Sequence, residues 1–541
     1  MDLVKNRTRL GIVALALGWL ADVLFFRQSL GINFPLFTLL TIAAGAWILY
    51  AEGARPAWGR SLILAGLALL FAFIPFVRQE PLTIFLSLVF CMVLLVGLAL
   101  SARGGQWPRF SLSDWVMGFF QLLLGTITGG GRLFLVSREK TQVEGETAPP
   151  NKRKLLWGLL RGLVLAFPVV LVLGLLLSAA DPIFSKRLAD ALSFLDPKRW
   201  PEYILRLFLI LGIAYELAGV FLFGIEKSGK RKLIGEDGPW LKPFLGWVEA
   251  AVILTGVVVL FSFFVIIQFQ YFFGGQANIN LEGYTYSEYA RRGFGELVWV
   301  AVLSLMLYLG LSTITQRSSR FASVSFSALG VLLVFLVGVM LISAFQRLLL
   351  YESVYGFTRL RTYTHIFMIW LGILLALTAA LEFTQLLRGF GLALLFTGLG
   401  FALTLAVINV DAHIARQNAA RALQGSQLDR YYLSDLSSDA APALVQLFES
   451  SPAGDARDQM GAELACRIVK DAKPITDPDE VLRWAEWPSF HLSPALAKTA
   501  LARVQPTLEA DYPVQANGEY DWQVRIRGEW QPCTVYRSMM D

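Results

Sequence analysis

The sequence predicts an all-α polytopic membrane protein of about 11 transmembrane helices, with a mainly α-helical C-terminal soluble domain that ends in a short β-hairpin. Long apolar stretches separated by short charged loops fill the chain as far as Ile408, and a polar segment follows from Asp411 to Asp541. The chain of 541 residues is 55% hydrophobic and 16% charged, whereas soluble domains carry about 25% charged residues.

Each apolar stretch is expected to be a helix, because lipid offers the backbone no hydrogen-bond partners and roughly 20 residues cross a core about 30 Å thick. The predicted spans are Leu10–Phe26, Phe34–Tyr50, Leu62–Val77, Leu82–Leu100, Gly162–Leu177, Tyr203–Phe223, Phe244–Phe273, Leu297–Ile314, Ser325–Phe345, Tyr363–Leu381 and Leu392–Ile408. The first span has no small-residue cleavage site after it and a second span follows closely, so it is interpreted as a retained helix.

Two further segments are amphipathic. Asp114–Leu135 is less apolar and contains Gly129-Gly130-Gly131, so an interfacial or re-entrant helix within the 101–154 loop is favoured over a span. Ile183–Leu195 mixes apolar and charged residues and is expected to lie along the opposite surface.

The loops carry an orientation signal, because cytoplasmic loops are enriched in Lys and Arg. Alternate loops hold 21 basic residues on one side and 10 on the other. The N-terminus is therefore expected in the cytoplasm, and an odd number of spans places the C-terminal domain outside. Residues 411–541 have 13 basic and 19 acidic residues, so the overall charge of +6 reflects positive loops facing an anionic leaflet and does not indicate nucleic acid.

The domains are expected at 1–410 for the helical bundle, 411–504 for the external helical domain and 505–541 for the hairpin segment. Two of the three cysteines, Cys466 and Cys533, fall after the bundle. A bond between them is allowed in an external domain. If Asp114–Leu135 crossed the membrane, the domain would be cytoplasmic and both thiols free.

Glu216 is the deepest ionisable residue in the predicted spans. Charged residues in spans are costly and suggest function, so Glu216 is a candidate for a proton or cation relay. The alternative, which is favoured, is a buried carboxyl that is protonated or paired with a neighbouring helix.

A polar cluster is expected where three distant segments meet at the outer face. Its candidate residues for binding an anion or lipid headgroup are Tyr286, Tyr289, Arg291, Arg292, Tyr351, Tyr355, Thr358, Arg361 and Arg416. Arg grips phosphate through paired hydrogen bonds and Tyr adds hydroxyl donors. The favoured alternative is an aromatic belt with salt bridges that dock the C-terminal domain on the bundle.

The common catalytic and nucleotide-binding motifs are absent from the sequence. The three histidines, His365, His413 and His491, are far apart in the chain, so no metal site, cofactor or enzymatic activity is expected.

Five stretches together resemble one family. They are Gly31–Phe37, Tyr286–Phe294, Tyr355–Arg361, Asn409–Asn418 and Leu433–Ala440. They resemble the bacterial multi-pass membrane proteins of domain of unknown function 4153/4173, from about Leu10 to about Leu501. The resemblance implies a bacterial inner membrane and the same multi-span plan, and it implies no activity.

These observations favour a non-enzymatic inner-membrane scaffold or binding protein of the bacterial envelope. Its expected partners are membrane lipid and an envelope protein, without nucleic acid, and the sequence does not fix its oligomeric state. The alternative is a transporter or translocator of a lipid-linked or anionic substrate that uses Glu216 and the outer cluster. A membrane enzyme acting on a lipid-linked substrate is the third interpretation.

Overall fold

The computed structural model describes residues 6–54, 56–135, 177–178, 181, 186–187, 200–229, 232–234, 236, 241–273, 294–472, 487–517 and 522–533. The chain forms two compact units. One contains residues 1–26 and 123–223, and the other contains residues 27–122 and 224–541, so the division falls within helices α5 and α8.

Ten described helices are long and apolar enough to cross a bilayer. They are α1 (Arg7–Phe25), α2 (Asn33–Ala51), α3 (Trp58–Val77), α4 (Pro81–Ser101), α8 (Trp200–Glu226), α9 (Trp247–Phe273), α12 (Phe294–Ile314), α13 (Arg320–Tyr355), α14 (Arg359–Phe383) and α15 (Phe390–Ile408), the last preceded by the short η6 (Leu387–Gly389). They match ten of the eleven predicted spans, and the eleventh, Gly162–Leu177, lies outside the described residues except for Leu177. The predicted fold class is confirmed.

In the first unit, α1 packs closely on α8. A Cβ on Gly18 would lie 2.4 Å from the carbonyl oxygen of Ile210, so glycine is needed for this approach. Asp22 is 5% exposed, and its carboxylate pairs with Arg206 at 2.6 Å. The ion pair compensates the cost of placing two charges on membrane helices.

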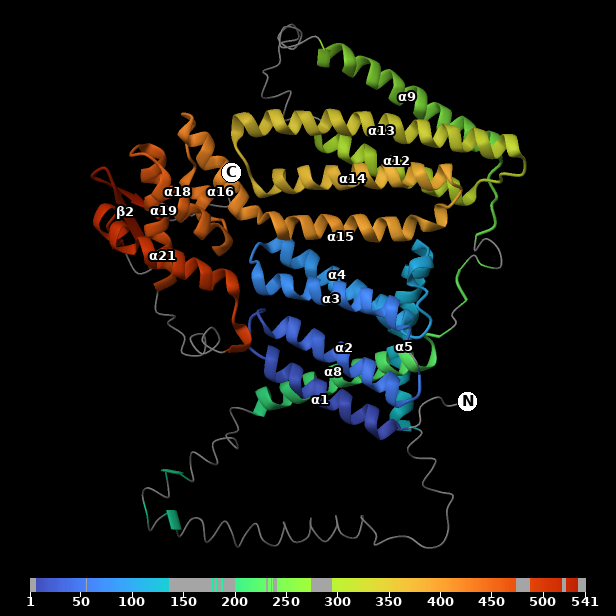
Figure 1. Cartoon of the computed structure of the whole chain (residues 1–541), viewed down its shortest axis with the longest axis horizontal. Coiled ribbons are helices and arrows are strands. Elements are labelled where there is room, and N and C mark those ends of the chain that lie inside the picture. The colour runs from blue at the N-terminus through green and yellow to red at the C-terminus, as the bar shows by residue number, and fades with distance from the viewer. Residues whose placement is uncertain are drawn as a thin grey trace. The chain divides into compact units, whose positions relative to one another are not determined.

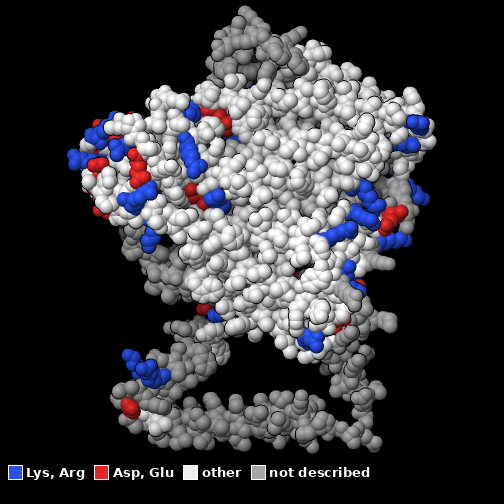
Figure 2. Space-filling model, in the orientation of Figure 1, with Lys and Arg blue, Asp and Glu red and all other residues white. Residues whose placement is uncertain are grey.

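In the second unit, neighbouring helices follow the order α9, α13, α14, α15, α4, α3 and α2, with α12 also against α13 (Figure 1). Two glycines let α15 lie between large aromatic side chains. A Cβ on Gly400 would lie 2.1 Å from Trp370 of α14, and one on Gly398 would lie 2.8 Å from Phe90 of α4. Figure 2 shows the face over α13, α14 and α15 almost without charged side chains, as lipid contact requires.

Helix α5 (Leu112–Leu135) follows the short η1 (Trp107–Arg109) and is not among the ten candidate spans. It is continuous through Gly129–Gly131, so the break expected there is absent from the backbone. Its exposed residues include Val116, Phe119 and Phe120, as in a helix lying at a membrane surface. Of the predicted amphipathic segment Ile183–Leu195, only residues 186–187 are described.

Helix α13 is 36 residues long, which corresponds to about 54 Å at 1.5 Å per residue. A bilayer core is about 30 Å thick, so α13 is longer than the predicted span Ser325–Phe345 and extends beyond the apolar layer. Its last turns therefore lie among polar groups.

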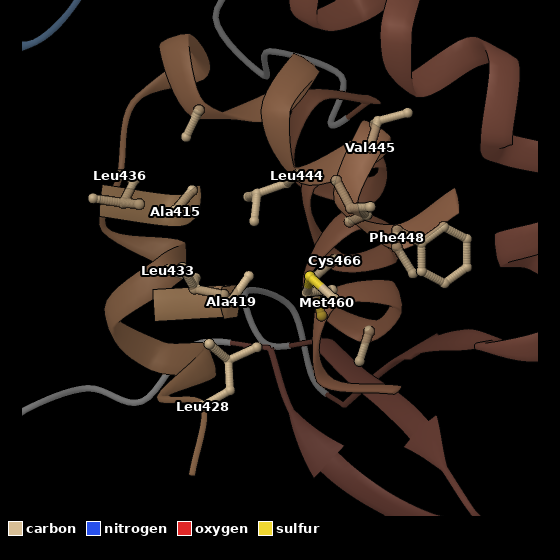
Figure 3. Close-up of a cluster of buried hydrophobic side chains, with 14 of the residues drawn as sticks. Ala415, Ala419, Leu428, Leu433, Leu436, Leu444, Val445, Phe448, Met460 and Cys466 are labelled. Atoms are coloured by element: carbon tan, nitrogen blue, oxygen red, sulfur yellow. The ribbon is translucent and has the colours of Figure 1, made fainter. Parts of the chain in front are cut away.

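The segment after α15, called the tail below, gathers at one end of α13, α14 and α15 (Figure 1). Its elements are α16 (Val410–Leu423), α17 (Arg430–Ser434), η7 (Ser438–Ala440), α18 (Ala441–Ser450), α19 (Asp455–Ala472), η8 (Trp487–Ser489), α21 (Leu492–Asp511), β1 (Val514–Ala516), β2 (Trp522–Ile526) and β3 (Glu529–Pro532). Aliphatic and aromatic residues form its core, among them Ala415, Leu444 and Phe448 (Figure 3).

The tail ends in an antiparallel sheet of order β1-β2-β3. The predicted hairpin corresponds to β2 and β3, in which Val524 is paired with Gln531, and β1 adds a strand. The buried side chains of Val524 and Ile526 alternate with exposed Arg525, which is the period-2 pattern of a half-buried strand. Helix α21 continues to Asp511, beyond the expected end at Val504.

Candidate functional site

The tail begins without a linker. Asn409 ends α15 and also begins α16. Its backbone is left-handed, with φ of 55°, a conformation that Asn tolerates better than most residues. Its side chain accepts a hydrogen bond from the backbone N–H of Ala412 at 3.2 Å. The direction of α16 is therefore set directly by the last span.

A buried ion pair joins the tail to the bundle. Arg359, at the start of α14, donates from Nε and Nη2 to the two carboxylate oxygens of Asp411 at 2.7 and 2.6 Å. The Asp411 side chain is fully buried and that of Arg359 is 24% exposed. Asp411 also accepts from the backbone N–H of Ser437 at 2.7 Å. Paired geometry and an additional donor are what a buried carboxylate needs to remain charged.

The same residues hold the next turn of the tail. The backbone N–H of Arg359 donates to the hydroxyl oxygen of Tyr432 at 2.7 Å. Burial raises the pKa of Tyr432, so this phenol is neutral at ordinary pH. Arg359 thus contacts α16 and α17 together.

A second contact lies at the start of α4. The Asp439 carboxylate accepts from the backbone N–H groups of Gln79 and Glu80 at 2.7 and 3.1 Å. Glu80 is 2% exposed and caps α4 by accepting from the N–H groups of Leu82 and Thr83 at 2.8 Å. The hydroxyl of Tyr363 on α14 donates to Glu80, which links α4, α14 and the tail.

A third contact lies at the turn between α13 and α14. Asn418 exchanges two hydrogen bonds with the backbone of Phe357, at 2.8 and 2.9 Å. Arg421 donates to the carbonyl groups of Ser353 and Val354 at 2.9 Å. Gly356 has φ of 79°, and a Cβ there would lie 2.5 Å from Arg421. The left-handed turn favours glycine, and a side chain there would displace the end of Arg421.

A fourth contact is made by Trp487–His491, called the aromatic loop below. The carbonyl oxygen of Phe490 accepts from the N–H of Ile32 at 3.0 Å, and the Ser489 hydroxyl donates to Gln28. A Cβ on Gly31 would lie 2.5 Å from the Phe490 carbonyl oxygen. The four contacts together, called the joint below, attach the tail to loops at one end of the bundle.

Some predicted cluster residues do lie together. The Arg361 guanidinium lies 4.1 Å from the ring centroid of Tyr351, and the rings of Tyr351 and Tyr355 are 4.8 Å apart. Arg361 also donates to the carbonyl oxygen of Gly356. Both Arg359 and Arg361 are therefore engaged with groups of the protein itself.

The other predicted residues are distributed differently. Thr358 precedes α14, where its carbonyl oxygen accepts from the N–H of Thr362 at 3.0 Å. Arg416 is exposed on α16. Glu216 is exposed on α8 in the other unit. The remaining candidates lie outside the described residues and are Tyr286, Tyr289, Arg291 and Arg292.

Two partly buried histidines, His365 and His413, lie near the joint although they are far apart in the sequence. The Nδ1 atom of His365 lies 3.0 Å from the carboxylate of Glu352, which is 1% exposed. His413 on α16 is half-buried; burial lowers its pKa, and the charge of Glu352 opposes that shift. Within the described residues no group of three His, Cys, Asp or Glu side chains could hold a metal ion.

The structure joins Cys466 of α19 to Cys533 after β3 in a disulfide, across 67 residues of chain. Cys91 is free and buried in α4. The bond attaches the residue after β3 to α19, whose Cys466 lies in the core of the tail (Figure 3).

The sequence did not single out Arg359, Asp411 and Asn418 as site residues. The available signal was their place in the stretches Tyr355–Arg361 and Asn409–Asn418. Asp439 had the same signal, because it lies in the stretch Leu433–Ala440. Tyr432 had none, because it lies in none of these stretches.

The fold and the joint define a multi-pass integral membrane protein with a structured C-terminal tail. The family model described as Domain of unknown function (DUF4153) matches residues 65–447. That match covers most of the chain and extends from α3 into α18, so the chain belongs to this family, as the resemblance predicted. No curated protein and no solved structure matches.

Proposed function

We propose that this protein is a non-enzymatic scaffold of the bacterial inner membrane, which holds its tail at a fixed orientation on the outer surface for contact with other envelope components. The observation that carries the proposal is the joint itself. The tail starts at Asn409 without a linker, and the buried Arg359–Asp411 pair fixes it to α14. A flexible tether would not need such a pair.

Two observations support an external tail. The disulfide between Cys466 and Cys533 suits an oxidising compartment. Helix α5 is not among the ten candidate spans of the described residues, so it does not change the predicted odd number of crossings, which these ten and Gly162–Leu177 make together. The positive bias of the loops points the same way.

The engaged arginines favour docking over headgroup binding. An anion site needs guanidinium groups with free donors facing the ligand. Arg359 uses its donors on Asp411, Arg421 uses Nη2 on two carbonyl groups, and Arg361 stacks on Tyr351. Arg359 and Arg421 are therefore used within the joint, and Arg361 is engaged next to it, whereas Arg416 of the predicted cluster is exposed on α16.

The orientation of the tail can be measured by the distance between two spin labels, at Ile369 of α14 and Gln446 of α18, in the C91A background. Wild-type protein in nanodiscs should give one narrow distribution. Arg359→Met leaves the buried Asp411 charge unpaired, which costs about 3–5 kcal/mol, so the distribution should broaden.

Arg503→Met is the matched control, because it removes an exposed pair with Glu449 whose side chains are 60% and 42% exposed. Its distribution should remain narrow, since exposed pairs contribute little. A broad distribution in the wild type would contradict a fixed tail.

The outer location has its own test. An alkaline phosphatase fused after Asp541 should be active in cells, because that enzyme folds only where its disulfides form. An inactive fusion, with a cytoplasmic reporter active at the same position, would place the tail inside and overturn the proposed orientation.

A transporter is the alternative, with Glu216 as its relay. Glu216→Gln removes the titratable carboxyl without changing side-chain size. The measurement is proton uptake into proteoliposomes. If the wild type catalyses uptake and this variant does not, the transporter would replace the scaffold as the proposed function. A scaffold should show no such uptake in either protein.

A further inference from the structure

Aromatic contacts continue from a membrane helix onto the tail. Phe73 of α3 is 48% exposed, and its ring centroid lies 5.1 Å from that of Phe76, one turn further along. The Phe76 ring lies 6.0 Å from the ring of Phe490 in the aromatic loop. Because an exposed apolar side chain on a span faces lipid, the lipid-facing surface of α3 is continuous with a side chain of the tail.

The aromatic loop is held beside the end of α3. Pro488 and Ser489 are buried, and the Phe490 carbonyl is bonded to Ile32 at the start of α2. The loop therefore lies beside the end of α3 and the beginning of α2, where the apolar part of the bundle ends.

The side chains of the loop that remain exposed are apolar. Trp487 is 62% exposed and Phe490 is 48% exposed, although both belong to the water-soluble part of the chain. Leu496, in the first turns of α21, is 52% exposed. Trp is enriched where apolar lipid meets headgroups, because its ring is apolar and its N–H is polar.

We propose that the aromatic loop is inserted in the headgroup layer of the bilayer, so that the partner of this surface is the phospholipid membrane. The inference deepens the proposed function, because it names the membrane as one component that the tail contacts. The apolar contact requires no particular headgroup charge. Trp487 and Phe490 should enter zwitterionic and anionic bilayers alike.

An environment-sensitive fluorophore tests the insertion. In the C91A background, Trp487→Cys and Trp530→Cys are each labelled with a nitrobenzoxadiazole probe and reconstituted into phosphatidylcholine nanodiscs. Trp530 is the control because it is 41% exposed but belongs to β3, in the sheet that lies at the far side of the tail from α3 (Figure 1).

The probe at residue 487 should be quenched at least twofold by lipids that carry a nitroxide near the headgroup, and the probe at residue 530 should not. Leu496→Cys provides a second position if the Trp487 variant is unstable. Equal quenching at residues 487 and 530, or quenching only when the nanodiscs contain phosphatidylglycerol, would overturn the proposal. Either failure is separate from the spin-label result, which reports only whether the tail is fixed.

Discussion

At the scale of single residues, a few charged side chains located away from lipid attach the tail to the bundle. Asp411 is buried and Arg359 is partly buried, and the Asp411 carboxylate accepts hydrogen bonds from Arg359 and from the backbone N–H of Ser437. A buried pair of this kind is weak evidence for net stability. The pair instead orients α16 relative to α14, because two parallel hydrogen bonds fix the angle as well as the distance between the partners.

The stability of the tail should depend on pH through two histidines. Burial lowers the pKa of His413 and that of His491 below the ordinary value of 6.5. The unfolded chain therefore binds these protons more tightly than the folded tail does. The contribution of the two neutral histidines to the stability of the tail should be fully present above about pH 6.5. It should be lost as the pH falls through the lower pKa of the folded state.

The measurement is the thermal midpoint of the tail between pH 5 and 8. The variant His413→Gln/His491→Asn should lose less stability on acidification than the wild type. Asn is chosen because Nδ1 of His491 accepts from the N–H of Ser493 at the start of α21, and Asn is a good residue at that position. Identical pH profiles would show that neither histidine is responsible.

At the scale of elements, the position of the joint depends on the length of α13 and on the turns next to the tail. Helix α13 is longer than a bilayer requires, so its end reaches the polar contacts of α16. Asn409 redirects the chain immediately after α15. Gly31 and Gly356 lie where the tail meets a loop of the bundle. Gly31 has no space for a side chain against the backbone of the tail, and Gly356 has a left-handed backbone.

Gly31→Ala should weaken the contact between the aromatic loop and the bundle. Its Cβ would lie 2.5 Å from the carbonyl oxygen of Phe490 and 2.8 Å from the backbone of Ser489, and neither backbone group can rotate away. We expect the contact to lose about 1–3 kcal/mol of stability, as at other overpacked sites. The measurement is the rate of proteolysis of the tail, which should increase.

Gly59→Ala is the matched control, because a Cβ at this position of α3 has nothing within 4 Å. Its proteolysis should equal that of the wild type. Equal rates for the two variants would show that close packing at Gly31 does not hold the loop.

At the scale of the whole molecule, the disulfide joins Cys533, immediately after β3, to Cys466 of α19. Replacing both cysteines, in Cys466→Ser/Cys533→Ser, should destabilise the tail by about 4 kcal/mol on the chain-entropy model for a loop of this size. The check is the thermal midpoint of the purified protein with and without reductant.

The wild-type midpoint should fall on reduction, whereas that of the double variant should not respond. Cys91→Ala, which removes the free thiol, should still show the response to reductant. Reaction of a maleimide with Cys466 or Cys533 in freshly isolated, unreduced membranes would contradict the bond.

The sequence by itself determined the class of protein, the positions of ten described spans and the change to a polar tail that ends in a hairpin. These features are local, because the length of an apolar stretch and the alternation in Trp522–Ile526 follow from neighbouring residues. The family resemblance also rests on short stretches of neighbouring residues, and the match over residues 65–447 confirmed it.

Only the tertiary structure decided which polar groups meet. Arg359 and Asp411 are 52 residues apart, and Tyr363 and Glu80 are 283 apart, so no spacing could pair them. The sequence offered Arg361 and Glu216 as candidate site residues, whereas the fold engages Arg359 in the joint and leaves Glu216 exposed on α8. Pairing of buried charges depends on the packing of whole helices, and that packing is decided by contacts between residues distant in the chain.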